Sequence, residues 1–142
     1  MRILVPLDGS ASANRAAAQA VALAAGRNDA QITLLNVQNQ QTLDASDISS
    51  ITSVGADAEL AVDQSNKALR EAAQLCRDAE VKFDTRSAFG AIAETINMIA
   101  REINADQIVM GTRGLGPLRG AVLGSVSSKV VQLARVPVTL VK

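Results

Sequence analysis

Residues 110–129 read MGTRGLGPLRGAVLGSVSSK, and five of the nine glycines of the chain fall within fourteen positions of this stretch. Glycine permits positive φ and lets backbone N–H groups approach an anion closely. The stretch ends at Gly124-Ser125, where a helical pattern begins, and the unpaired N–H groups of a helix N-terminus favour phosphate. The stretch therefore predicts a phosphate-binding loop, in which Arg113 and Arg119 fit either a phosphate contact or a solvated surface charge.

Two better-known phosphate motifs do not fit the chain. A Walker A loop needs Lys followed by Ser or Thr after its last glycine, but Pro117 and Leu118 follow Gly116. A dinucleotide fingerprint follows the first strand, which here ends in Asp8-Gly9-Ser10. The alternative interpretation is a flexible linker, and Ser125 is expected to cap the helix whether or not a ligand binds. The spacing that does hold is G-x2-G-x9-G-S, at Gly111, Gly114, Gly124 and Ser125.

Outward from this stretch, short β-rich runs alternate with longer helical patterns. The alternation predicts an α/β fold, an open parallel sheet with four helices distributed over both faces and right-handed crossovers. One domain spanning residues 1–142 is expected. Ligands of such sheets bind beyond the carboxyl ends of the strands, at the switch point. Strands are expected at 3–7, 32–37, 81–87, 108–110 and 136–141, and helices at 12–27, 57–79, 92–103 and 125–134.

Two further loops follow predicted strands and carry unusual chemistry. Asp8 precedes Gly9-Ser10, and it fits either a ligand contact at the switch point or an ordinary turn residue. The loop 38–56 is polar and nineteen residues long. Loops longer than about 12–15 residues are uncommon and are usually functional or disordered. An ordered lid and a mobile segment both remain open for it.

Composition excludes several classes of function. Fourteen basic residues balance fourteen acidic ones, and the chain has two Phe but no Tyr or Trp, which argues against nucleic-acid binding. The absence of His excludes His-based metal sites and triads. Cys76 lies in a helical pattern and is expected to be a buried, reduced thiol. No secretory signal or bilayer-spanning apolar run is recognisable, so a cytoplasmic protein without a membrane partner is expected.

The glycine spacing is one of several recognisable motifs. The others are ILVPLDGS at 3–10, LLNV at 34–37, NADQIVMGTRG at 104–114, LGSV at 123–126 and VPVTLV at 136–141. Together they resemble the universal stress protein family over essentially the whole chain. Two positions depart from the family pattern. Phe89-Gly-Ala-Ile92 stands where the family often has Gly-Asp/Asn-Pro, and Asn36 stands where many members have His.

The resemblance implies a Rossmann-like, adenine-nucleotide-binding sheet of five parallel strands in the order 3-2-1-4-5. The switch point then lies between the first and fourth strands, which end at Asp8 and Gly111. Members that keep the complete glycine pattern resemble the ATP-binding branch, with Mg²⁺ held through the phosphates. Carried over by position, Asp8 and Val37 would face the adenosine, and Met110 and Gly111 would line the ribose and α-phosphate. The rest of the expected site is Pro6, Leu7 and Arg113, with Gly114, Gly124, Ser125 and Val126 on the phosphates.

The resemblance also implies an ATP-binding regulatory module of the stress response. Two alternatives stay open, a slow ATP hydrolase and a dimeric scaffold that binds either no ATP or another adenine nucleotide such as cyclic AMP. No Walker lysine and no positioned acid–base group is recognisable, so catalysis is expected to be weak at most. The segment 136–141 would be an edge strand, which invites pairing. The resemblance suggests that it pairs with its two-fold mate in a homodimer.

Overall fold

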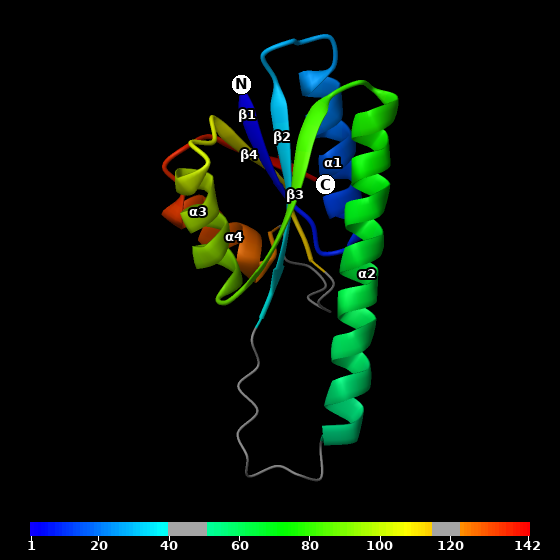
Figure 1. Cartoon of the computed structure of the whole chain (residues 1–142). Helices are drawn as coiled ribbons and strands as arrows, with labels where there is room; N and C mark the ends of the chain where they lie inside the picture. The colour runs from blue at the N-terminus through cyan, green and yellow to red at the C-terminus, as the bar shows by residue number, and fades with distance from the viewer. Residues whose placement is uncertain (40–50, 115–122) are drawn as a thin grey trace.

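The computed structural model describes residues 1–39, 51–114 and 123–142, apart from the side chains of 51–59 and 61. All strands lie in one parallel sheet in the order β3-β2-β1-β4-β5. The predicted α/β class and strand order are confirmed. Along the chain the elements are β1 (Arg2–Pro6), α1 (Ala11–Ala24), β2 (Gln31–Gln38), α2 (Ile51–Asp78), β3 (Lys82–Phe89), α3 (Ile92–Glu102), β4 (Gln107–Gly111), α4 (Ser125–Leu133) and β5 (Val138–Val141) (Figure 1).

Two hydrophobic layers sandwich the sheet. Figure 1 shows α1 and α2 on one side of the sheet and α3 and α4 on the other. Strand β1 is buried on both faces because its side chains alternate: Ile3 and Val5 pack in the layer under α1 and α2, whereas Leu4 packs under α3 and α4. Alanine dominates the buried stripe of α1, so this helix lies close to the strands.

Several element boundaries differ from the sequence predictions. Helix α2 begins at Ile51 rather than at residue 57, so the last residues of the expected loop 38–56 belong to the helix. Strand β3 runs to Phe89 rather than to 87. Strand β5 begins at Val138 rather than at 136, because Pro137 has no N–H to donate. The question of a lid falls partly on residues 40–50, which lie outside the described residues.

Four described leucines at apolar positions of the helices are exposed. Leu60 on α2 is 57% exposed and Leu133 on α4 is 42% exposed. Leu23 and Leu75 are also exposed. The buried stripe of α1 consists largely of alanines, whereas the buried residues of α4 are Ser127 and Val130. The N-terminal part of α2 also extends beyond the ends of the strands (Figure 1).

Cys76 is a free thiol with no exposed surface, and burial raises its pKa from 9.0 to about 11. This agrees with the interpretation of a buried, reduced side chain. No helix among the described residues is both long and apolar enough to cross a bilayer.

The buried thiol predicts a pH dependence of stability. The thiol ionises near 9.0 in the unfolded chain but only near 11 in the folded one. The unfolded state therefore loses its proton first, and the free energy of unfolding falls as the pH rises between these values. Cys76→Ala has no thiol to ionise, so its free energy of unfolding lacks this fall. The difference in free energy of unfolding between parent and variant should therefore narrow between pH 9.0 and about 11 in urea titrations. A constant difference would contradict the assignment.

Candidate functional site

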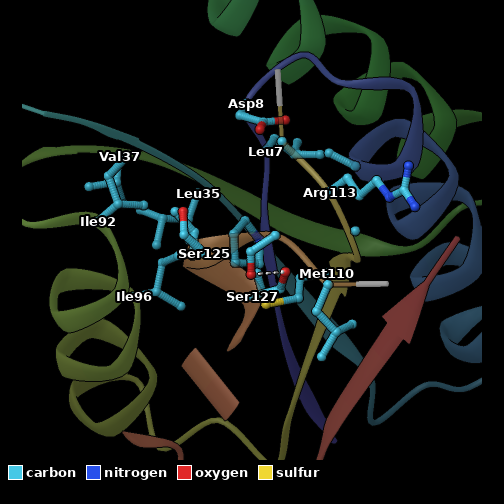
Figure 2. Close-up of a pocket in the computed structure, with 17 residues that line it drawn as sticks. Leu7, Asp8, Leu35, Val37, Ile92, Ile96, Met110, Arg113, Ser125 and Ser127 are labelled. Carbon is cyan, nitrogen blue, oxygen red and sulfur yellow. Dashed lines mark hydrogen bonds between the residues drawn. The ribbon is translucent and has the colours of Figure 1, made fainter. Parts of the chain in front are cut away.

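A cavity of about 330 Å³ opens beyond the carboxyl ends of β1 and β4 (Figure 2). All eleven site residues named from the sequence line it, although their contact with a ligand stays a prediction. They are Pro6, Leu7, Asp8, Val37, Met110, Gly111, Arg113, Gly114, Gly124, Ser125 and Val126.

The cavity lies at the predicted switch point. Strand β1 pairs with β2 on one side and with β4 on the other. After β1 the chain enters α1 on one face of the sheet, whereas after β4 it leads to α4 on the opposite face. Two connections that diverge in this way leave a crevice between the strand ends, which is where α/β sheets hold ligands.

Six lining residues were not named from the sequence. Ile92 and Ile96 of α3 form part of the apolar wall together with Leu35 of β2. The sequence could have indicated Ile92, because this residue follows the carboxyl end of β3 closely. It therefore lies at the edge of the sheet where ligands bind. The other three are Ala13, Leu123 and Ser127.

The departure from the family pattern at 89–92 reaches this wall. Gly90 has φ +144°, and Ala91 precedes α3 without a side-chain cap. Phe89 is 69% exposed, whereas Ile92 points its side chain toward the cavity near Val37 (Figure 2). The departure therefore places an aliphatic residue in the wall.

The second departure, Asn36, is buried beneath the end of β1. Its Nδ2 donates to the carbonyl of Leu7 at 2.8 Å, and its Oδ1 accepts from Gln38 Nε2 at 2.8 Å. The backbone N–H of Leu7 donates to the carbonyl of Leu35 at 2.7 Å. The N–H and the carbonyl of Leu7, the residue before Asp8, are thus both hydrogen-bonded to β2.

Asp8 performs the local turn role that was its alternative interpretation. Its Oδ1 accepts from the backbone N–H of Ser10 at 2.9 Å, and Gly9 between them has φ +87°. The second oxygen, Oδ2, faces Gly114, where an added Cβ would lie 2.8 Å away. Asp8 also lines the cavity, so the turn role leaves one carboxylate oxygen available for a ligand.

Gly111 and Gly114 are needed for space rather than for positive φ, whereas Gly124 has room for a Cβ. Left-handed φ values among the described glycines occur at Gly9, Gly26 and Gly90, so the expectation of positive φ is wrong for 111, 114 and 124. A Cβ on Gly111 would lie 2.7 Å from the backbone nitrogen of Ala13, in the first turn of α1. Positions 116 and 120 lie outside the described residues.

The N-terminus of α4 faces the cavity without a side-chain cap. Gly124, not Ser125, is the N-cap, with φ −70° and ψ 164°, so the predicted capping role of Ser125 is wrong. The Gly124 N–H donates to the carbonyl of Thr112 at 2.7 Å. The first intrahelical donor is Ser128 N, which bonds the Gly124 carbonyl at 3.0 Å. Helix geometry therefore leaves the N–H groups of residues 125–127 without intrahelical acceptors.

The described lining of the cavity contains two charged side chains, those of Asp8 and Arg113. Arg113 lies at its rim and is exposed, and its guanidinium points away from Ser125 (Figure 2). Arg119, the other predicted cation, lies outside the described residues. The described residues contain no cluster of three or more side chains suited to a metal ion. Among the described residues, the N-terminus of α4 adds its partial positive charge to that of Arg113.

An open parallel sheet with a cavity at its switch point and a helix N-terminus on the cavity wall defines a Rossmann-like α/β protein. The model of the universal stress protein family matches residues 1–142, and the chain belongs to this family.

Related proteins agree with this assignment. A putative universal stress protein of Staphylococcus epidermidis is 34% identical over 145 residues, which cover 99% of this chain and 82% of the relative. A universal stress protein from Lactobacillus plantarum superposes with a TM-score of 0.84 at 25% identity, over 100% of this chain and 97% of that one. A universal stress protein in complex with cAMP superposes with a TM-score of 0.74 at 27% identity, with the same coverage of both chains.

The close approach at Gly111 predicts the effect of a single methyl group. Gly111→Ala should lower the free energy of unfolding by about 2 kcal/mol or more in urea titrations, since the new Cβ meets backbone atoms that cannot move independently. Gly124→Ser is the matched control. An added Cβ there lies 3.4 Å from its nearest neighbour, so a change within about 0.5 kcal/mol is expected. Equal costs for the two variants would contradict the packing argument.

Proposed function

We propose that this chain binds an adenine nucleotide, preferentially ATP, in the cavity at the switch point. It then acts in the cytoplasm as a nucleotide-dependent regulatory module of the stress response, with residues 1–142 as one domain. One observation carries the proposal: the residues of the glycine motif and the uncapped N-terminus of α4 line a single cavity. Helix N-termini of this kind suit phosphate.

The cavity wall divides into two chemically different parts. Aliphatic side chains of β2 and α3 supply a surface for a flat purine, chiefly Leu35, Ile92 and Ile96. Asp8 can accept hydrogen bonds from ribose hydroxyls or from the adenine amine through the oxygen that Ser10 does not occupy. The volume of about 330 Å³ lies within the range of small-molecule sites.

The α4 N-terminus can supply much of the binding energy. Hydrogen bonds to a charged partner contribute roughly 1.5–3 kcal/mol each. Three such bonds from the N–H groups of residues 125–127 amount to roughly 4.5–9 kcal/mol, and a micromolar complex needs about 8 kcal/mol. The ordering of ligand and side chains subtracts from this sum. Micromolar affinity for a nucleotide is therefore a reasonable expectation.

Mg²⁺ would be held through the phosphates rather than by a protein-built site. Mg²⁺ commonly keeps several waters and takes one or two carboxylates together with substrate phosphates. Asp8 is the carboxylate that the described part of the lining offers. Its free oxygen is assigned to the adenosine, so the metal would rest on the phosphates and on water, and no step of the proposed binding depends on it.

Cyclic AMP is the second candidate ligand, because a structural relative at 27% identity is in complex with it. ATP and cyclic AMP would present the same adenosine group to the aliphatic wall, but they differ in phosphate charge. Denaturing protein purified without added ligand and identifying the released nucleotide separates the two. Timed phosphate release from the same preparation measures any turnover.

The N-cap position separates folding from binding. In Gly124→Asp the new carboxylate caps α4 and should keep or raise the melting temperature without ligand. The same charge at the phosphate position should abolish the rise in melting temperature that ATP gives the parent. At an ATP concentration of 100 times Kd, binding should stabilise the parent by about 2.7 kcal/mol.

Ser128→Asp is the control, because it adds the same charge to α4 from a residue outside the described lining. It should keep most of the ATP response. A Gly124→Asp variant that responds to ATP as the parent does would show that the phosphates bind elsewhere.

We also propose that the chain forms a homodimer through β5. This strand is at the edge of the sheet, where it pairs with β4, and its residues Val138–Val141 are all partly exposed. An apolar edge strand of this kind is a template for pairing with a second chain. A two-fold axis at that edge would bring the strand against its own copy.

A pair of threonines tests the dimer. Thr139→Lys places like charges near each other across the two-fold axis and should shift the parent dimer to monomer in sedimentation velocity at micromolar concentration. Thr85→Lys makes the same change on β3, the opposite edge, and should leave the dimer intact. A parent that sediments as a monomer would refute the proposal.

A further inference from the structure

Two consecutive carbonyls at the exit of β4 are held by serine side chains. The Thr112 carbonyl accepts from Ser127 Oγ at 2.7 Å and from the Gly124 N–H at 2.7 Å. The Arg113 carbonyl accepts from Ser12 Oγ at 2.6 Å and from a second hydroxyl, that of Ser10, at 3.2 Å. Each carbonyl therefore has two donors.

The three serines come from the first turns of the two helices that flank the cavity. Ser10 is the N-cap of α1, and Ser12 lies in its first turn. Ser127 lies in the first turn of α4. All three side chains are buried, and Ser127 is only 2% exposed. The exit of β4 is thus fastened to α1 on one side and to α4 on the other.

Packing alone does not require these hydroxyls. The buried residues around Ser12 in α1 are alanines, and serine has a lower helix propensity than alanine. A buried hydroxyl is also costly unless it is hydrogen-bonded. Here each hydroxyl has a backbone partner whose position fixes the cavity wall.

We propose that Ser10, Ser12 and Ser127, which we name the serine clasp, are positioning residues for phosphate binding. By fixing the carbonyls of Thr112 and Arg113, the clasp holds the N–H groups at the start of α4 in register with the end of β4. The inference rests on the proposed nucleotide function and adds to it. The aliphatic wall formed by Leu35 and Ile96 belongs to β2 and α3, so the clasp affects the phosphate end of the ligand and not the base.

Single substitutions test the clasp without removing the fold. Ser127→Ala leaves the Thr112 carbonyl with the Gly124 N–H, and Ser12→Ala leaves the Arg113 carbonyl with Ser10 Oγ. No buried carbonyl is orphaned in either variant. Ser128→Ala is the matched control, because it removes a hydroxyl from the next position of α4, outside the described lining.

Titration calorimetry with adenosine, AMP and ATP gives the decisive readout. In Ser127→Ala and Ser12→Ala the Kd for ATP should rise about tenfold, the Kd for AMP should rise less, and the Kd for adenosine should stay within about twofold. Ser128→Ala should match the parent for all three ligands. An unchanged Kd for ATP, or equal losses for ATP and adenosine, would overturn the inference.

Amide hydrogen exchange without ligand separates this inference from the proposed function. In Ser127→Ala the Gly124 N–H should exchange faster than in the parent and in Ser128→Ala. The Thr112 carbonyl then keeps only one of the two hydrogen bonds that tie it to the start of α4. Unchanged exchange would contradict the clasp itself. A parent that binds neither adenosine nor ATP would contradict the proposed function and, with it, the phosphate role of the clasp.

Discussion

The end of β4 lies against the first turn of α1 with no space for a side chain at Gly111, and the rest of the site depends on this contact. It brings the carbonyls of Thr112 and Arg113 within reach of hydroxyls on both flanking helices. The same placement leaves the start of α4 directed at the cavity. A backbone contact at one residue thus determines where two helix N-termini meet the sheet.

The cavity combines an apolar wall with a polar end because α3 and α4, which cover the same face of the sheet, present different groups to it. Helix α1 is rich in alanine and lies close to the strands, whereas α3 contributes large aliphatic side chains such as Ile92 and Ile96. The backbone N–H groups of α4 supply the polar end. A ligand with a flat apolar part and an anionic part matches both surfaces.

Much of the fold follows from the sequence, since alternating strand and helix patterns specify a parallel sheet and the family resemblance adds its strand order. Asp8 and the glycine loop could be named because they follow strand ends, and the family resemblance supplied the other site residues. Other features depend on tertiary packing that no local pattern contains. The need for Gly111 comes from α1, a segment about a hundred residues away. The exposure of Leu60 reflects how far α2 extends past the strands. The role of Ser127 depends on its hydrogen bond to the Thr112 carbonyl, which the sequence does not show.

A crystal structure of the protein grown with ATP tests the central claim most directly. We expect the adenine against Leu35 and Ile96, and phosphate oxygens within hydrogen-bond distance of the backbone nitrogens of Ser125 and Val126. A nucleotide bound elsewhere, with the cavity filled by the protein's own side chains, would contradict this assignment.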